Sequence, residues 1–307
     1  MNYKLLFFTL SVALFAISCK KEEAAPYEPP TEAKLIFKFK FDSTQERLNN
    51  FGEPADVADG HAAQSPIMDT MSAHYIELAP NANTPLGSGD IMYRAPELEI
   101  GGETAIDFEK AKLVANDSVF LEVPIKAIKP GDYEYLRVSI SYQSARVKFY
   151  VDTAVGPISI KQTSDANIAG FIGYNTYIKD FKIGDSVITV NDSKKQGFWG
   201  FYTAGQYLTF NYKFATTGQA PEGATTVVNP IFTTSPIPPG SCVVTAAFKP
   251  GKLTITGKEA NDIVVEVSFS TNKSFEWTEV VNDGKWEPLK GENITDMGIR
   301  GMIPTIK

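Results

Sequence analysis

The sequence predicts an all-β protein, an antiparallel β-sandwich with long Gly/Pro-rich loops. Two observations carry this prediction: many short segments alternate apolar and polar residues with a period of two, and turn residues separate them. The 307-residue chain contains 23 glycines and 19 prolines, and 12% of its residues are aromatic. No helical periodicity extends beyond a turn or two, except over residues 43–49, where a short helix with Ser43 as its cap is predicted.

The first predicted strand covers residues 35–42, where Leu35, Phe37 and Phe39 share one face. Further strands are predicted over residues 71–78, 119–125, 136–142, 147–151, 171–177, 181–183 and 187–190. The C-terminal part adds strands over residues 208–214, 242–248, 252–256 and 263–269. Residues 49–66 and 80–102 are predicted as long loops, and residues 191–193 and 196–197 as breakers between strands.

Composition divides the chain into three regions: a signal peptide over residues 1–18, a lipidated cysteine with a flexible tether over residues 19–33, and a β-sandwich over residues 34–307. A Pro-rich stretch near residues 216–240 leaves a division into two subdomains open. The N-terminal apolar run is too short for a bilayer core, which needs about 20 residues, and fits a secretory signal. An uncleaved anchor helix or a buried core helix is the alternative.

The residues around Cys19 resemble the lipobox of bacterial lipoproteins, because Ala16-Ile17-Ser18 precede the cysteine at the end of the apolar run. The resemblance implies cleavage before Cys19, acylation by palmitate-type chains and attachment to a membrane through these lipids. Lys21, Glu22 and Glu23 follow and resemble the surface-export signal of Bacteroidota lipoproteins. The implied location is the outer membrane, lipid-anchored at the cell surface; a solvated, charged tether is the alternative for this triplet.

Charge argues against nucleic acid as a partner. The chain has 29 Lys and Arg and 36 Asp and Glu, and the signal peptide contains one lysine, Lys4, and no acid. The mature chain therefore carries 28 − 36 = −8, whereas nucleic-acid binding needs a basic patch. Once Cys19 is acylated, Cys242 is the only thiol, so no intrachain disulfide can form.

One candidate site lies around the two histidines, His61 and His74, with Met68 and Met71 between them. Imidazole and thioether together suit copper, and the same groups serve as axial ligands of haem iron. The alternative is that the methionines fill gaps in the core. The leading functional prediction is ligand capture outside the cell, with a copper-type metal held by His61, Met68, Met71 and His74.

The segments SAHYIELAP and PGDYEYLRVSISY are similar to the copper-binding methanobactin-partner lipoprotein family. The similarity covers a minor part of the chain. It implies a β-rich extracytoplasmic domain, copper as the ligand and a tryptophan near the metal, for which the segment FWGF at residues 198–201 is the counterpart.

A second candidate site is a calcium loop around Asn282-Asp283-Gly284. Aligned on Gly284, the loop has Glu279, Val281 and Asp283 at its first, third and fifth positions and Lys290 at its twelfth. Because Val281 and Lys290 offer no side-chain oxygen, the loop is degenerate, and calcium is less expected than copper. Outside the pattern, oxygens are available from Glu287, Glu292 and Asp296. The alternative is an Asn-Asp-Gly hairpin turn.

A third candidate is the uncharged aromatic segment that contains Trp199, Tyr202 and Tyr207. Exposed aromatic rings at a cell surface stack on sugars or contact a protein, whereas buried ones form sandwich cores. The alternative function is therefore a non-catalytic accessory lipoprotein that binds a glycan or a partner protein of an outer-membrane uptake system.

No hydrolase, metalloprotease, nucleotide-binding or dinucleotide-binding motif is present. Cys242 follows Pro-Gly-Ser in a predicted strand and fits a small buried hydrophobe better than a nucleophile. A carboxylate pair would suffice for a glycosidase, but the spacing of the acids singles out no pair. The sequence predicts a protein that is not an enzyme.

Overall fold

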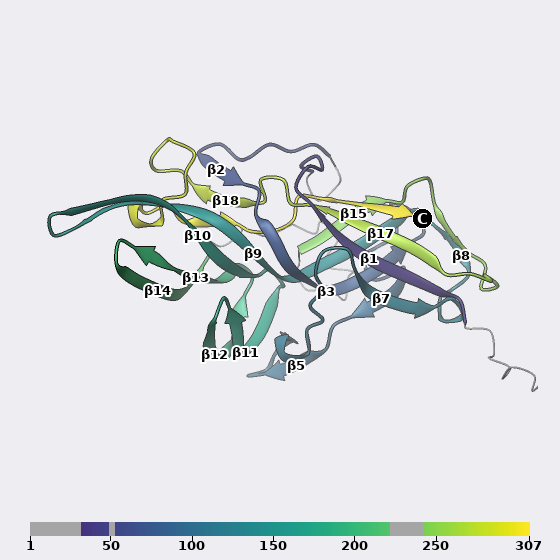
Figure 1. Ribbon diagram of the computed structural model, residues 1–307. Coiled ribbons are helices and arrows are strands. Elements are labelled where there is room, and N and C mark those ends of the chain that lie inside the picture. The colour runs from purple at the N-terminus through teal and green to yellow at the C-terminus, as the bar shows by residue number, and fades with distance from the viewer. Residues whose placement is uncertain (1–31, 49–52, 222–241) are drawn as a thin grey trace, which may run out of the picture. The chain divides into compact units, whose positions relative to one another are not determined.

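The computed structural model describes residues 32–48, 53–221 and 242–307, which belong to one compact unit, Glu32–Lys307. This unit is built from packed, mainly antiparallel sheets, so the predicted all-β sandwich is confirmed (Figure 1). Its described helical elements are single 3₁₀ turns: η1 (Phe108–Lys110), η2 (Ile125–Ala127) and η4 (Pro288–Lys290). Among the residues described, no helix has the length and apolar character to cross a membrane.

The largest sheet has seven strands and runs in the order β14-β13-β10-β9-β3-β4, with β15 also paired to β9. Its strands are β3 (Ile67–Ala79), β4 (Asp90–Arg94), β9 (Tyr135–Val155), β10 (Ile158–Phe171), β13 (Phe198–Tyr207), β14 (Phe210–Gln219) and β15 (Cys242–Ala247). We call it the central sheet.

Strand β9 connects the two ends of the central sheet. One edge of β9 pairs with β3 through Tyr135 to Arg146. Along the other edge β15 pairs with Tyr135 to Ile140, and β10 with Tyr142 to Val155. The last part of β9 thus extends beyond β3 as a hairpin with β10, beside the hairpin of β13 and β14 (Figure 1).

A second sheet, in the order β20-β17-β1-β7, packs on the first half of β9. Its strands are β1 (Lys34–Asp42), β7 (Ser118–Pro124), β17 (Ile263–Ser270) and β20 (Met302–Ile306). β1 and β17 are parallel neighbours, and the other pairs are antiparallel. Alternate residues of β1, including Phe37 and Phe39, meet Leu136, Val138 and Ile140 of β9 in the main core.

Two smaller sheets cover opposite faces of the central sheet farther along β9. The sheet β12-β11-β6-β5, with β5 (Glu97–Ile100), β6 (Glu103–Asp107), β11 (Asn175–Ile183) and β12 (Ser186–Lys195), packs against Tyr142 and Phe171. The sheet β19-β18-β2, with β2 (His61–Gln64), β18 (Phe275–Thr278) and β19 (Ile294–Asp296), packs against Val147 and Phe149. A two-stranded sheet pairs β8 (Gly131–Tyr133) with β16 (Leu253–Ile255).

Several local predictions are wrong. Strand β2 lies within the loop predicted over residues 49–66, and β4 and β5 lie within the loop predicted over residues 80–102. The breaker at residues 191–193 is a β-bulge within β12, where Asn191 adopts a φ of 50°. No helix follows Ser43 in the described residues; the Asp42 carboxylate accepts the backbone N–H groups of Thr44 and Gln45 and shapes a turn.

Candidate binding site

An apolar groove of about 640 Å³ lies on one face of the two extended hairpins. Because side chains alternate along a strand, one face of β9 and β10 presents the lining residues Phe149, Val151, Ile158, Ile160, Gln162 and Ser164. The opposite face of the same hairpin carries cross-strand ion pairs, Lys148 with Asp165 and Lys161 with Asp152. The hairpin is therefore amphipathic, with the groove on its apolar face.

The second hairpin continues the same apolar surface. β13 contributes Trp199, Phe201, Thr203 and Tyr207, and β14 contributes Phe210, Tyr212, Phe214 and Thr216. Two glycines let the largest rings lie flat on this surface. A Cβ on Gly218 would lie 2.1 Å from the Trp199 indole, and one on Gly205 would lie 2.6 Å from the Tyr212 hydroxyl. These glycines face the two aromatic residues across the hairpin.

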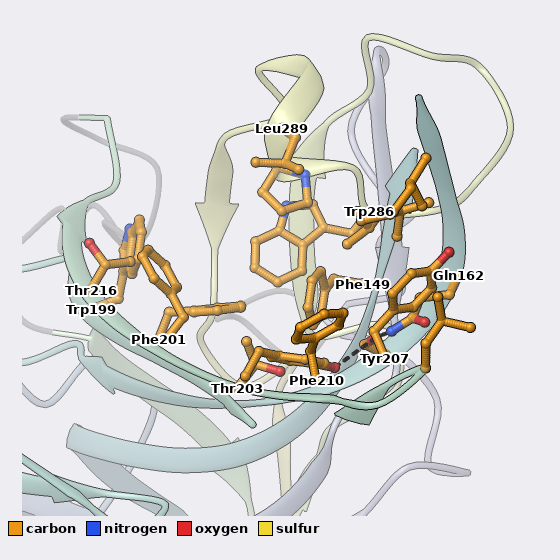
Figure 2. A pocket seen from close by; sticks show the side chains of 18 residues that line it. Phe149, Gln162, Trp199, Phe201, Thr203, Tyr207, Phe210, Thr216, Trp286 and Leu289 are labelled. Atoms are coloured by element: carbon orange, nitrogen blue, oxygen red, sulfur yellow. Dashed lines mark hydrogen bonds between the residues drawn. The ribbon is translucent and has the colours of Figure 1, made fainter. Parts of the chain in front are cut away.

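The wall opposite the sheet comes from the loop over residues 279–293, which contributes Trp286, Pro288 and Leu289 (Figure 2). The loop is attached to the free edge of β9, since the Tyr150 N–H donates to the Trp286 carbonyl at 2.7 Å. The Trp286 ring packs edge-to-face on Phe201 and Phe275. The groove is thus enclosed between a sheet and a fixed loop.

Glu292, which is buried, holds this loop in its conformation. Its carboxylate accepts three backbone N–H groups, from Val280 at 3.0 Å, Val281 at 3.1 Å and Glu287 at 2.6 Å. Its carbonyl accepts the Trp286 indole N–H at 3.1 Å. Three bonds to one carboxylate, together with the bond from Tyr150, hold the wall in position.

The polar side chains of the lining already have partners within the protein. Gln162 Nε2 donates to Ser164 Oγ at 2.8 Å, Thr203 Oγ1 donates to the Asp165 carbonyl at 2.8 Å, and the Tyr207 hydroxyl donates to the Ser159 carbonyl at 3.2 Å. None of the lining residues is charged. An occupant of the groove can therefore form few hydrogen bonds with the lining, and its binding depends mainly on apolar contact.

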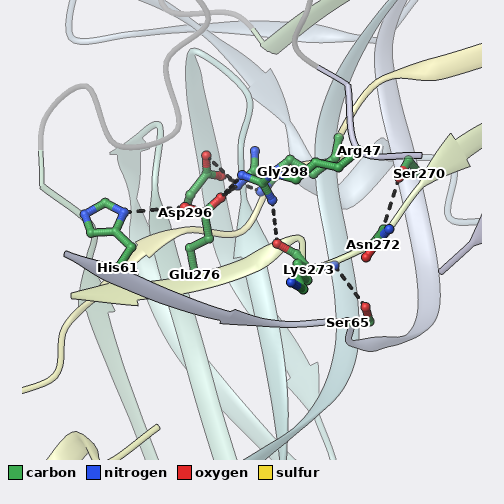
Figure 3. Close-up of polar contacts among 10 residues, drawn as sticks. Arg47, His61, Ser65, Ser270, Asn272, Lys273, Glu276, Asp296 and Gly298 are labelled. Atoms are coloured by element: carbon green, nitrogen blue, oxygen red, sulfur yellow. Dashed lines mark hydrogen bonds and ion pairs between the residues drawn. The ribbon is translucent and has the colours of Figure 1, made fainter. Parts of the chain in front are cut away.

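A second recess, of about 480 Å³, lies beside β18 and is lined mainly by polar and charged residues. Figure 3 shows the polar contacts among several of them. Glu276 is the central group of the recess: both Arg47 and Arg300 donate to Oε1, and His61 Nδ1 lies 3.4 Å from Oε2. Arg300 also pairs with Asp296 at 2.8 Å. Burial opposes the ionisation of Glu276, but the two guanidinium groups outweigh burial and hold its pKa below the ordinary value. This ion cluster ties β18 and β19 to the chain before β2 and after β19.

The structure does not bring the four predicted copper ligands to one point. β3 is extended and rises about 3.3 Å per residue, so Met68 and His74 lie roughly 20 Å apart along it, apart from small corrections for bulges. His74 is buried with Nε2 on Glu97 at 2.9 Å, whereas His61 faces Glu276. Met71 packs in the main core. One ion cannot contact all four side chains in this conformation.

Three of the carboxylates proposed for calcium, those of Glu279, Asp283 and Glu292, accept backbone N–H groups of the loop, and Asp296 pairs with Arg300. Glu279 accepts the Gly284 N–H at 2.6 Å, Asp283 accepts the Lys285 N–H at 2.9 Å, and Glu292 accepts three N–H groups as described above. Within the described residues, no group of three or more His, Cys, Asp or Glu side chains is arranged to hold a metal ion. The calcium site stays a prediction from the sequence.

Two of the three predicted aromatic ligand residues, Trp199 and Tyr207, line the groove. Tyr202 lies on the opposite face of β13 and is buried against the sheet that contains β11. The alternation of β13 separates them, because positions 199 and 207 share a parity that 202 lacks.

Sequence reasoning missed Phe149, Trp286 and Leu289 as site residues. A signal for the first was available, because the apolar residues of β9 change phase: they occupy even positions up to Tyr142 and odd positions from Ala145 to Val151. Such a change means that one strand buries opposite faces in its two halves. No sequence pattern indicates the loop residues, because their position depends on a long-range bond from Tyr150 and on bonds to Glu292 within the loop.

Comparisons of the chain with protein-family models, with curated proteins and with solved structures gave no match. Cys19, Lys21, Glu22 and Glu23 lie outside the described residues. The groove and the N-terminal sequence are therefore the features of the molecule that bear on its function.

Proposed function

We propose that this protein is a non-catalytic binding protein that holds an apolar ligand in the groove, and that it is displayed at the surface of the outer membrane by the lipid on Cys19. The groove is the observation that carries the binding role. Its volume of about 640 Å³ lies within the usual range for small-molecule sites, roughly 300–1,000 Å³. Rims of exposed large apolar side chains rarely occur on a protein without such a use.

An apolar ligand fits this groove better than a glycan. A sugar would lose hydrogen bonds to water on entering, and hydroxyl groups of the lining and the Gln162 N–H group already bond to one another or to the backbone. Stacking on Trp199 alone would leave those losses uncompensated. An apolar molecule loses no such bonds and gains about 25 cal/mol for each Å² of apolar surface removed from water.

The test is a fluorescence titration of the unit Glu32–Lys307 with the apolar dye N-phenyl-1-naphthylamine. We expect saturable, stoichiometric binding that a charge at the rim weakens, as in Phe210→Asp or Leu289→Asp. Both residues are largely exposed, 70% and 64%, so these variants should fold. Val187→Asp is the matched control, because Val187 is 65% exposed on β12 and away from the groove. Dye binding that all three variants share with the unmodified chain would refute the groove as the site.

The proposed location depends on the N-terminal sequence and is tested separately. A membrane-impermeant reagent should label the full chain on intact cells, and mutation of Lys21, Glu22 and Glu23 to alanine should abolish this labelling without detaching the protein from the membrane. Cys19→Ala should release the protein from the membrane. Unchanged surface labelling of the triplet variant would contradict the export signal, whatever the dye titration gives.

A further inference from the structure

The groove is elongated and has a buried and an exposed end. Phe201, on β13 near its inner end, is 6% exposed, whereas Leu208 and Phe210 at the hairpin tip are 68% and 70% exposed. From Phe201 to Tyr207 the strand advances by about 20 Å. A ligand that follows the strands would therefore have one end in the protein and the other end in water.

The aromatic rings at the inner end leave no slot for a flat ligand. Phe201 packs edge-to-face on Phe149, Phe214 and Trp286, with centroid separations of 5.4, 6.2 and 5.9 Å. A planar ring would need two parallel faces to lie between, and these rings meet at 60–79° instead. Aliphatic side chains, including Val151, Ile160 and Leu289, complete the lining. Around Phe201, this surface of ring edges and methyl groups suits a flexible chain.

The charged side chains of the β9–β10 hairpin lie outside the groove, so they do not bind a head group within it. Lys148, Asp152, Lys161 and Asp165 are all on the face opposite the groove, paired with one another at 2.9–3.2 Å. The groove itself offers neither a charge nor an unpartnered buried polar atom that would bind a head group. Selection must therefore come from the apolar part of the ligand.

From these observations we infer that the groove takes one hydrocarbon chain of an amphiphile, with the chain along β13 and β10 and the polar head at the exposed hairpin tips. This inference rests on the proposed function, since it names the class of the ligand for the same site. The chain is recognised by length and flexibility, and the head group contributes little to affinity.

The experiment is displacement of bound N-phenyl-1-naphthylamine from Glu32–Lys307 by octanol, decanol, dodecanol and tetradecanol, and by the matching fatty acids. Each buried methylene should raise affinity about fourfold, until the groove is filled and the affinity levels off. Each alcohol and its matching acid should agree within about threefold, because neither head is bound. Phosphatidylcholine vesicles form a further arm: displacement by vesicles assigns a membrane lipid as the source of the chain, and displacement by free acids alone assigns a soluble one.

A variant with a shortened groove gives a second readout. Val151 is half-buried in the lining opposite Gln162, so Val151→Trp adds bulk within the groove without removing a hydrogen bond. Affinity should then level off at a shorter chain, whereas Val187→Trp should match the unmodified protein. Dye binding with no dependence on chain length, tighter binding of pyrene than of any chain, or displacement only by apolar peptides would each overturn the inference and leave the proposed function standing. Absence of dye binding would overturn both.

Discussion

The same alternation of apolar residues continues through both halves of β9, but the two halves place their apolar residues on opposite faces of the strand. In the first half the even-numbered residues Leu136, Val138 and Ile140 are fully buried in the main core, beneath β1 and β17. In the second half the odd-numbered residues Val147, Phe149 and Val151 face the other side, where β18, β19 and the 279–293 loop cover only part of them. A complete cover makes a core, and an incomplete one leaves the groove.

The difference lies in the cover and not in the strand. A four-stranded sheet lies over the first half, and its phenylalanines interlock with β9. A three-stranded sheet and one loop lie over the second half, and the tips of both hairpins extend beyond them (Figure 1). Because its cover is incomplete, the groove half should be easier to open and more tolerant of substitution than the core half.

The largest effect should come from Phe39, at the centre of the main core. Phe39→Ala removes a ring stacked on Phe120 at 4.4 Å and in edge contact with Phe269 at 4.9 Å, so unfolding should become easier by about 3–5 kcal/mol. Phe210→Ala, at an exposed site of the groove, should change stability by no more than about 0.5 kcal/mol. Denaturant unfolding measures both; equal losses would contradict the comparison.

Acid should open the groove half first. The pKa of Glu276 is lowered in the folded protein, so its ion pairs contribute fully above the unfolded value, near 4.3, and are lost as the pH falls through the folded value. All three tryptophans, Trp199, Trp277 and Trp286, belong to the groove half. Their fluorescence should therefore change at a higher pH than the onset of Cys242 exposure.

Cys242 reports on the core half. It is buried among main-core residues, and burial raises the pKa of its thiol to about 12, so modification at neutral pH requires opening of the core.

Glu276→Gln should lower stability on the order of 3 kcal/mol at neutral pH, because Arg47 and Arg300 lose their shared carboxylate, and it should remove the early acid transition. Simultaneous loss of both signals in the unmodified chain would show that the halves open together.

The sequence predicts the strands of this molecule better than it predicts which layer covers each strand. Alternation identifies β1, β17 and each half of β9, because each of these stretches buries one face. It misses β13, where residues 200–203 are buried on both faces of the strand. It does not say which layer covers a face, since that depends on pairings such as β1 with β17, more than 200 residues apart. Trp199 and Tyr207 could therefore be identified as exposed-face candidates, but the wall formed by Trp286 and Leu289 could not.

A smaller effect is expected from Glu292, which fixes that wall. Glu292→Ala leaves three backbone N–H groups without their acceptor, at a cost of about 1–3 kcal/mol confined to the loop. Displacement of Trp286 should then weaken dye binding roughly tenfold, while the main core keeps its stability. Faster hydrogen exchange at Val280, Val281 and Glu287 is the structural readout. Glu279→Ala, which removes one exposed bond in the same loop, is the control and should leave binding unchanged.

The smallest effect, and the sharpest test of what the groove selects, is expected at Gln162. Its amide donates to Ser164 and serves the protein's own surface, so Gln162→Leu should change stability by no more than about 1 kcal/mol and keep or improve dye binding. A site built for a polar ligand would behave oppositely, because removal of a recognising amide would cost at least tenfold in affinity. A large loss of binding in Gln162→Leu, with Val187→Leu unaffected, would show that the groove reads polar groups. Retained binding would mean that the open half of β9 is an uncovered core surface, which an apolar chain completes without hydrogen bonds to the lining.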